Sequence, residues 1–328
     1  IRKIGFLNKG SVLMLLSILD KIKKESTNVE FVSSVSISSK SLPYLKRSVL
    51  GLYQKFELQK LGISFNFLGN LIPVKFRNKF GIILDKEIDI VIDASGFSYS
   101  DQWGNNNCKE FAIFCKRMKK NATKIILMPQ AFGPFKNLRN KKNMEIIMNY
   151  ADLVFARDKI SHENLVKLTD NKSNLKISGD FTNLLEGIVP LNFDNELNKF
   201  CIVPSYRMMD KLKKNDSDIY LQLIIEATRY VYEKGQKPFI LIHEDKKDEL
   251  NLAHRIRENV NREIKIIKFS DALETKGILS LTSGLIGSRY HALIGALSQD
   301  VPALGVGWSH KYKELFENYG FPEGFLAL

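Results

Sequence analysis

Short apolar runs that end in polar or glycine-containing turns alternate with helical patterns along this chain. The clearest example occupies residues 279–312. There a short strand is predicted to end at Ile286, a glycine turn follows, and apolar residues at helical spacing begin at Ala292. Val301–Val306 is a further apolar run after a proline-containing turn. Such alternation favours parallel sheets covered by helices, so the chain is predicted to be α/β, with doubly wound, Rossmann-like domains.

The alternation recurs in both halves of the chain. A length of 328 residues exceeds what one hydrophobic core usually supports, so two domains are expected. A polar stretch at residues 187–198, with Pro190 and several asparagines, marks the boundary. We therefore predict domains at residues 1–190 and 191–328 that face each other across a cleft. The first should open with a strand over Arg2–Leu7, a turn, and an amphipathic helix over Val12–Lys24.

Two basic side chains lie at the turn between the strand that ends at Ile286 and its following helix. Arg289 and His291 occupy the predicted first turn of that helix. Helix N-termini present backbone N–H groups and a partial positive charge, and Arg adds donors suited to phosphate or carboxylate. One interpretation is an anion-binding site. The other is an ordinary helix start whose Arg and His lie on the surface.

Other predicted strands also end in polar residues. Asp93 ends the buried run Ile88–Asp93, and the same strand leads into a loop containing Ser95. The other strand ends of this kind are at Gln130, Arg157, Arg207 and His243. Because ligands in such folds bind at the carboxyl ends of the strands, these side chains are candidates for an enzyme site. Two alternatives remain: Asp93 caps its turn, and Arg157 forms a surface ion pair with Asp158 or Glu163.

The chain is strongly basic, with a formal net charge of +13. This charge fits polyanions, an anionic membrane or small anionic substrates, and a Lys-rich composition alone explains it equally well. Residues 40–79 combine lysines with aromatic residues. They are either a membrane- or nucleic-acid-facing surface, or helices that pack their apolar faces together. We expect no nucleic-acid partner, because no nucleic-acid-binding motif accompanies them and the Arg and His residues gather at strand ends.

The cysteine spacing and the hydropathy of the sequence indicate the cellular compartment in which we expect the protein. Cys108, Cys115 and Cys201 have neither metal-ligand nor disulfide-framework spacing, which suits a reducing compartment. No apolar run approaches transmembrane length, and no secretory signal pattern is visible. We expect a cytoplasmic protein, either free or in peripheral contact with the inner face of the membrane. No metal centre or other cofactor is expected.

Several short motifs, spread in order over nearly the whole chain, resemble those of the polysaccharide pyruvyl transferase family. The C-terminal stretch I-G-S-R-Y-H-A-L-I-G-A-L-S-Q-D-V-P-A-L and the following G-W-S-H-K-Y carry most of the resemblance. N-K-G-S, I-D-A-S-G-F-S, M-P-Q-A-F-G-P-F, F-A-R-D-K-I-S, S-G-D and L-I-H-E-D support it. The resemblance implies two Rossmann-like domains in a glycosyltransferase-B-like arrangement. It also implies transfer of a pyruvyl group from phosphoenolpyruvate to a sugar, usually as a ketal across two hydroxyls.

The same resemblance assigns roles to residues. Arg289 and His291 match the family's R-x-H anion-binding pair, and Arg157 matches the Arg of its R-D-x-x-S motif. Lys311, in S-H-K-Y, adds positive charge. His291 acts either as the general acid that protonates the methylene carbon or as a donor to the phosphate. Apart from the resemblance, we expect the base that activates the sugar hydroxyl to be Asp93 or Asp101, because both are carboxylates at or after a strand end.

The remaining candidate residues are assigned to substrate binding, and a second type of enzyme is kept as an alternative. His243, Ser95 and Gln130 are expected to bind substrate. The acceptor is expected to be a sugar of a cell-surface polysaccharide or of its lipid-linked precursor. The alternative is a glycosyltransferase of the same fold with a nucleotide-sugar donor. It would hold a diphosphate at the same helix start, but no acidic ribose partner is evident after the R-Y-H turn.

Overall fold

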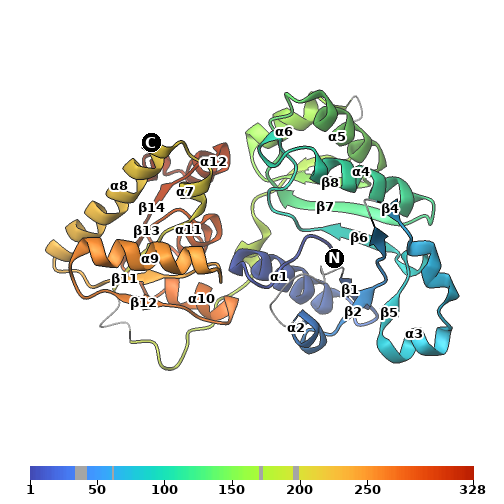
Figure 1. Cartoon of the computed structure of the whole chain (residues 1–328), viewed down its shortest axis with the longest axis horizontal. Coiled ribbons are helices and arrows are strands. Elements are labelled where there is room, and N and C mark those ends of the chain that lie inside the picture. Colours follow the sequence, from blue (N-terminus) through green and yellow to red (C-terminus); the bar gives the residue numbers. More distant parts are fainter. Residues whose placement is uncertain (34–42, 61–62, 170–172, 195–198) are drawn as a thin grey trace. The chain divides into compact units, whose positions relative to one another are not determined.

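The computed structural model describes residues 1–33, 43–60, 63–169, 173–194 and 199–328. The chain forms two compact units, Ile1–Phe6 with Met14–Phe181, and Leu7–Leu13 with Thr182–Leu328 (Figure 1). The division lies between Phe181 and Thr182, ahead of the predicted boundary after residue 190. Residues 7–13 belong to the second unit, and no local sequence pattern had indicated this. Among the described residues, no helix is long and apolar enough to span a membrane.

The first unit contains two parallel sheets and a separate short antiparallel pair of strands. Its strands are β1 (Phe31–Ser33), β2 (Leu52–Lys55), β3 (Gln59–Lys60), β4 (Ile63–Ser64), β5 (Ile82–Ile83), β6 (Ile90–Asp93), β7 (Lys124–Gln130), β8 (Leu153–Ala156) and β9 (Leu175–Ile177). They pair in the orders β6-β7-β8-β9 and β1-β2-β5, all parallel, while β3 and β4 form the antiparallel pair.

The first two residues of the chain run between these two sheets. Arg2 forms an isolated parallel bridge with Asp93, and the amino group of Ile1 donates to the Val32 carbonyl at 2.6 Å. The predicted strand over Arg2–Leu7 is therefore wrong in extent, because regular pairing is limited to the bridge at Arg2. The chain leaves the sheet after it and enters the second unit at Leu7.

Helices cover both faces of the β6-β7-β8-β9 sheet. The helices of this part of the chain are α1 (Lys9–Glu25), α2 (Pro43–Val49), α3 (Val74–Phe80), α4 (Asn106–Lys119), α5 (Leu138–Tyr150) and α6 (Lys159–Val166). Val91 of β6 packs with Phe111 of α4 and Ile147 of α5. Its neighbour Ile92 faces the other way, toward Met14 and Ile18 of α1. Successive strand residues point to opposite faces, so helices on both sides bury both faces of the sheet.

The second unit contains one six-stranded parallel sheet. Its strands are β10 (Phe200–Val203), β11 (Pro238–Leu241), β12 (Lys265–Ile267), β13 (Gly284–Gly287), β14 (Ala303–Val306) and β15 (Phe325–Leu326). Its helices are α7 (Arg207–Asp210), α8 (Lys214–Glu233), α9 (Lys247–Val260), α10 (Ala272–Leu279), α11 (Tyr290–Leu297) and α12 (His310–Asn318). The strand order is β12-β11-β10-β13-β14-β15.

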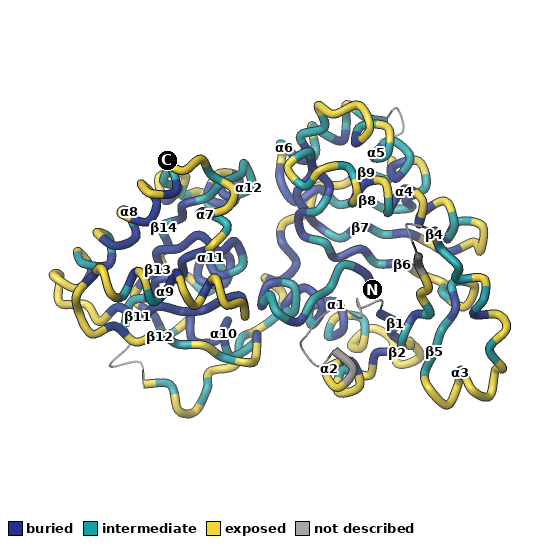
Figure 2. Tube along the Cα trace, viewed as in Figure 1, coloured by how far each residue is buried: buried dark blue, intermediate teal, exposed yellow. Residues whose placement is uncertain are grey.

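Both faces of this sheet are also buried. Cys201 and Leu285 pack toward α10, α11 and α12, whereas the adjacent Ile202 and Ile286 pack toward α8 and α9. The central strands β11 and β13 are buried along their whole length, as the dark blue in Figure 2 shows. The predicted fold class is confirmed: both units are α/β with doubly wound parallel sheets. The cleft between them stays a prediction.

The strand order identifies where a ligand would bind in the second unit. Successive strands are added outward from β10 to one edge and outward from β13 to the other. In doubly wound sheets the ligand crevice lies outside the carboxyl ends of the strands, at the point where the order reverses. Here that switch point lies between β10 and β13.

Candidate anion site at the switch point of the second unit

Three strands bring polar side chains to this switch point. Ser205 follows β10, His243 follows β11, and Ser288 with Arg289 follows β13. All four residues are at most 8% exposed. These residues lie close together because β10 pairs in parallel with both β11 and β13. Val203 lies opposite Gly287, and Ile202 lies opposite Ile240. The predicted residues His243 and Arg289 are therefore brought to one end of the same sheet.

The turn near the start of the chain lies beside the end of β11. The Lys9 N–H donates to the His243 carbonyl at 3.2 Å, and the Asp245 N–H donates to the Leu7 carbonyl at 2.9 Å. Asn8 also forms an antiparallel bridge with Glu244. The Asn8 side chain then accepts a hydrogen bond from the Gly10 N–H at 2.9 Å, as an N-terminal cap does. The N-terminus of the 17-residue helix α1 thus starts at the switch point.

Gly10 lies directly against the imidazole ring of His291. A Cβ atom on Gly10 would stand 2.2 Å from Nδ1 of His291 and 2.9 Å from its Cβ. These are closer than van der Waals contact, and the histidine Cβ is fixed to the start of α11. Position 10 therefore needs the absence of a side chain, and the N-K-G-S turn sets the position of His291.

Replacing Gly10 with alanine is expected to displace His291 and lower the catalytic efficiency about 100-fold, the effect of misplacing a catalytic group by about 1 Å. The measurement is kcat/KM for the pyruvyl transfer that the family resemblance implies, together with the melting temperature. Gly179→Ala is the control, because a Cβ there would meet nothing within 4 Å. If Gly10→Ala and Gly179→Ala had the same efficiency, the contact between Gly10 and His291 would have no part in the activity.

Arg289 is held between two carboxylates. Its guanidinium lies 2.6 Å from Glu244 and also pairs with Glu249, and all three residues are buried. Burial acts to lower the pKa of Arg289, but Glu249 and Glu244 outweigh it and hold the pKa above its ordinary value. Glu249 in turn accepts from the Tyr206 N–H at 3.1 Å. Arg289 is therefore charged and fixed in place, and it is not the surface residue of the alternative interpretation.

His243 and Lys9 complete the buried part of the cluster. Burial lowers the pKa of His243 well below its ordinary value, and the positive charges of Arg289, His291 and Lys9 lower it further. His243 is therefore uncharged at neutral pH. Lys9 is 3% exposed, and its ammonium donates to the Ser270 carbonyl at 2.6 Å.

His291 and Lys311 lie nearer to solvent than the groups described above. His291 follows Tyr290, whose ring meets the imidazole edge-on with centroids 5.6 Å apart. The Lys311 ammonium lies 5.1 Å from the centroid of the Tyr290 ring and 5.5 Å from that of Trp308. Such cation–π contacts hold the ammonium without neutralising its charge. Both residues are partly exposed.

This cluster has the properties of an anion site. Two helices, α1 and α11, begin here, and each N-terminus carries a partial positive charge. The lysines at positions 9 and 311 add full positive charges, and the two histidines add further polar groups. Groups of this kind bind phosphate or carboxylate. Among the described residues, no group of three His, Cys, Asp or Glu side chains is arranged to hold a metal ion.

In the first unit, three predicted residues form a single chain of hydrogen bonds. Ser95 donates to Gln130, and Gln130 donates to Asp93 at 3.1 Å. Asp93 is completely buried and also accepts from Arg2 and from the Tyr99 hydroxyl, each at 2.9 Å. The oxygens of Asp93 are thus engaged in holding β6, β7 and the start of the chain together. Its role as the base stays a prediction.

Arg157 and Asp101 are also engaged within the first unit. The Arg157 guanidinium pairs with Asp180 at 2.8 Å, and both side chains are 3% exposed. Arg157 is therefore not a surface residue, and Asp158 caps α6 by accepting from the Ser161 N–H. Asp101 accepts from the backbone N–H groups of residues 136 and 137 and from the Asn140 side chain.

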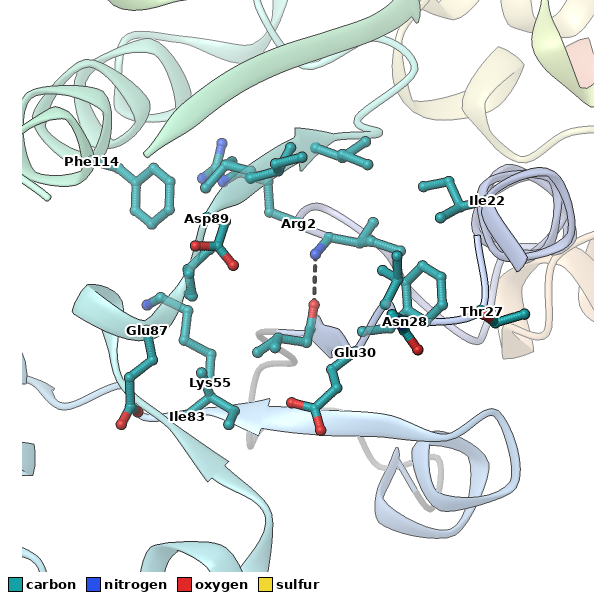
Figure 3. A pocket seen from close by; sticks show the side chains of 18 residues that line it. Arg2, Ile22, Thr27, Asn28, Glu30, Lys55, Ile83, Glu87, Asp89 and Phe114 are labelled. Carbon is teal, nitrogen blue, oxygen red and sulfur yellow. Dashed lines mark hydrogen bonds between the residues drawn. The ribbon is translucent and has the colours of Figure 1, made fainter. Parts of the chain in front are cut away.

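A pocket of 750 Å³ in the first unit is separate from these strand ends. It lies beside Ile1 and Arg2, between β1 and β6, and Asp93, Ser95, Gln130 and Arg157 are not among its described lining residues. Figure 3 shows that its walls carry both signs of charge, with Arg2 and Lys55 near Glu30, Glu87 and Asp89. Arg2 and Lys55 already pair with carboxylates. We therefore do not take this pocket as the functional site.

The structure adds four residues that sequence reasoning did not select. Lys9 and Gly10 reach the site from the start of the chain, and Glu244 and Glu249 hold Arg289. The N-K-G-S motif was a signal for the first two, and L-I-H-E-D contained Glu244. No local pattern indicated Glu249, because it lies on α9 and meets Arg289 only through the fold.

Several solved structures resemble this fold. They include UDP-GlcNAc 2-epimerases from Methanocaldococcus jannaschii (TM-score 0.56, 12% identity, 97% of this chain and 85% of that one) and Neisseria meningitidis (0.59, 10%, 95% and 84%), the latter bound to UDP-GlcNAc. The Anabaena protein HepE, in complex with UDP and glucose, is a third (0.51, 13%, 89% and 77%). At these identities the likeness concerns the fold alone. No curated protein matches the chain.

A family model assigns the chain more specifically. The model described as polysaccharide pyruvyl transferase matches residues 8–310. The matched region begins at the turn that contacts His243 and His291, and it includes every residue of the switch-point cluster except Lys311, which directly follows its last residue. Because the match covers nearly the entire sequence, the chain belongs to the polysaccharide pyruvyl transferase family, a family of enzymes of polysaccharide biosynthesis.

Proposed function

We propose that this protein transfers a pyruvyl group from phosphoenolpyruvate to a sugar and forms a pyruvate ketal. The acceptor is a sugar of a cell-surface polysaccharide or of its lipid-linked precursor. The observation that carries the proposal is the convergence of two helix N-termini, Lys9, His291 and Lys311 at the switch point of the second unit. Phosphoenolpyruvate carries a phosphate and a carboxylate close together, and such a site offers donors to both.

In the proposed reaction the methylene carbon of phosphoenolpyruvate accepts a proton, which produces an oxocarbenium-like centre. A sugar hydroxyl attacks the adjacent carbon, which carries the phosphate oxygen, and loses its proton; inorganic phosphate then leaves with the electrons of its C–O bond. A second hydroxyl then closes the ketal and loses its own proton. His291 delivers the first proton or donates to the phosphate, and Lys311 and the helix N-termini balance the charge of the leaving group.

The other predicted residues have supporting roles in this proposal. Arg289 holds the start of α11 through its two carboxylates and so fixes His291. Arg157, Ser95 and Gln130 serve substrate binding, and Asp93 or Asp101 serves as the base. The chemistry needs no redox step and no metal ion, so we propose that phosphoenolpyruvate is used without a cofactor.

A glycosyltransferase with a nucleotide-sugar donor is the alternative, and one observation favours it. Structures with this fold contain UDP or UDP-GlcNAc. In Rossmann-like sheets an acidic residue near the end of the second strand binds the ribose, and Glu244 follows β11 in that place. However, Glu244 is already paired with Arg289 at 2.6 Å, which makes it a poor ribose acceptor.

Calorimetric titration with phosphoenolpyruvate tests the proposal. Replacing Lys311 with methionine should weaken binding about 10- to 100-fold, the loss expected for one charge-assisted contact. Lys313→Met is the matched control, because Lys313 lies on the same helix α12 and its side chain is 63% exposed in a surface pair with Glu317. An equal loss in both variants would indicate only a general effect of charge, and the absence of binding to the wild type would exclude this donor.

A further inference from the structure

A group of large apolar side chains is exposed on the first unit. It occupies the 3₁₀ helix η1 (Asn66–Leu71) and the helix α3, which follow one another in the chain. We call residues 66–80 the phenylalanine–lysine surface. Its exposed members are Phe67 (64%), Leu71 (78%), Val74 (59%), Phe76 (51%) and Phe80 (55%). Figure 2 shows α3 as an exposed segment.

One interpretation of residues 40–79 was that their helices pack their apolar faces together. That interpretation requires these side chains to be buried, and they are exposed. Phe76 and Phe80 contact one another with tilted rings whose centroids are 4.5 Å apart, yet both remain more than half exposed. Residues 40–42 and 61–62 of that stretch lie outside the described part of the chain. Scattered single apolar residues on a surface are ordinary, but five within fifteen residues form a patch of the kind that marks an interaction site.

The charge of this surface has one sign. Lys75 and Lys79 are exposed on α3 among the phenylalanines, and the Lys79 ammonium lies 5.8 Å from the Phe80 ring. The sequence has no Asp or Glu from Leu58 to Leu84. An apolar face interleaved with lysines and free of acidic residues is the composition of segments that bind at an anionic membrane interface.

The phenylalanine–lysine surface is also held firmly on the unit. Arg77, the buried cation of α3, forms a pair with both oxygens of Glu87 at 2.7 and 2.6 Å. Gly69 lies so close to Phe56 and Leu84 that a Cβ there would meet them at 2.7 and 2.6 Å. The side of each helix that faces the protein is thus fixed, and Phe67, Phe76 and Phe80 remain exposed.

We propose that the phenylalanine–lysine surface docks the protein on an anionic lipid membrane. The apolar rings would enter the interfacial region, and Lys75 and Lys79 would contact anionic headgroups. A second copy of the chain fits this surface less well, because pairing two copies would bring lysines of like charge together. Docking does not depend on the identity of the pyruvyl donor, and it would bring the enzyme to acceptors that are carried on lipids.

Flotation of the full chain with vesicles tests this proposal. We expect binding to vesicles that contain phosphatidylglycerol and little binding to pure phosphatidylcholine vesicles. In Lys75→Gln with Lys79→Gln the partition coefficient should fall about 25-fold, because each lysine near an anionic surface contributes about fivefold. Lys109→Gln with Lys116→Gln is the matched control, since both lysines are exposed on α4 of the same unit.

The apolar contribution has its own matched pair of variants. Leu71→Ser with Phe76→Ser should lower the partition coefficient at least about tenfold, because two large side chains no longer enter the interface. The control is Leu138→Ser with Ile113→Ser, whose side chains are 72% and 51% exposed, nearly the same as Leu71 and Phe76. Equal binding of all variants, or equal binding to neutral and anionic vesicles, would overturn the proposal. A dimer abolished by Leu71→Ser with Phe76→Ser, without vesicle binding, would instead show an interface between copies.

Discussion

Replacing His291 with asparagine is expected to lower the rate of pyruvyl transfer about 10²- to 10⁴-fold, the usual contribution of a general acid. Asparagine keeps a hydrogen-bond donor of similar size but cannot deliver a proton. The contact with Gly10 is lost only in part, so the start of α11 should keep its position. Phosphate release from phosphoenolpyruvate in the presence of acceptor measures the effect.

The same variant separates the two roles proposed for His291. If His291 is the acid, kcat falls and the KM for phosphoenolpyruvate changes little, because binding is retained. If it only donates to the phosphate, the asparagine amide replaces much of its function, and KM changes more than kcat. His162→Asn is the control, since His162 is a partly exposed histidine on α6. A His291→Asn enzyme with the wild-type rate would remove His291 from the reaction.

The second large effect concerns stability. Replacing Arg289 with alanine is expected to lower the free energy of unfolding by about 3–5 kcal/mol, because Glu249 remains buried without the Arg289 cation and Glu244 keeps only its pair with Lys246. Arg229→Ala is the control: its pair with Glu226 on α8 is exposed and should contribute less than about 1 kcal/mol. Urea unfolding followed by circular dichroism gives both values.

A double variant shows whether the buried carboxylates cause this loss. Adding Glu249→Gln to Arg289→Ala removes the buried negative charge that has lost its Arg289 partner, so part of the lost stability should return. If the double variant were as unstable as the sum of the single changes, the pairing would not be the cause. The expected instability also means that reduced substrate binding by Arg289→Ala alone would not identify Arg289 as a ligand for the substrate.

The fold could be predicted where the sequence contains strong local patterns. The run that ends at Asp93 is rich in β-branched residues, and it forms β6. The alternation of strands and helices gave the doubly wound sheets. By contrast, β5 and β15 have two residues each, too few for any periodicity to show. The strand predicted over Arg2–Leu7 is wrong in extent because, within that range, only Arg2 pairs with a strand, and the chain passes into the second unit at Leu7.

The site could be predicted only in part, for a similar reason. Arg289, His291 and His243 follow strands, and parallel pairing brings strand ends together. The partners that define their chemistry come from distant parts of the chain: Gly10 lies against His291, Glu249 binds Arg289, and Asp180 binds Arg157. These contacts depend on three-dimensional packing and have no fixed sequence spacing. The motifs N-K-G-S and S-G-D contained two of these residues, but no sequence pattern indicated what they would touch.

The central claim is that the switch-point site binds phosphoenolpyruvate and not a nucleotide sugar. Its most direct test is a calorimetric titration of the wild-type protein with phosphoenolpyruvate, repeated in the presence of excess UDP-GlcNAc. We predict binding at one site, unchanged by UDP-GlcNAc. Binding of UDP-GlcNAc with no heat from phosphoenolpyruvate would contradict the claim and favour a glycosyltransferase.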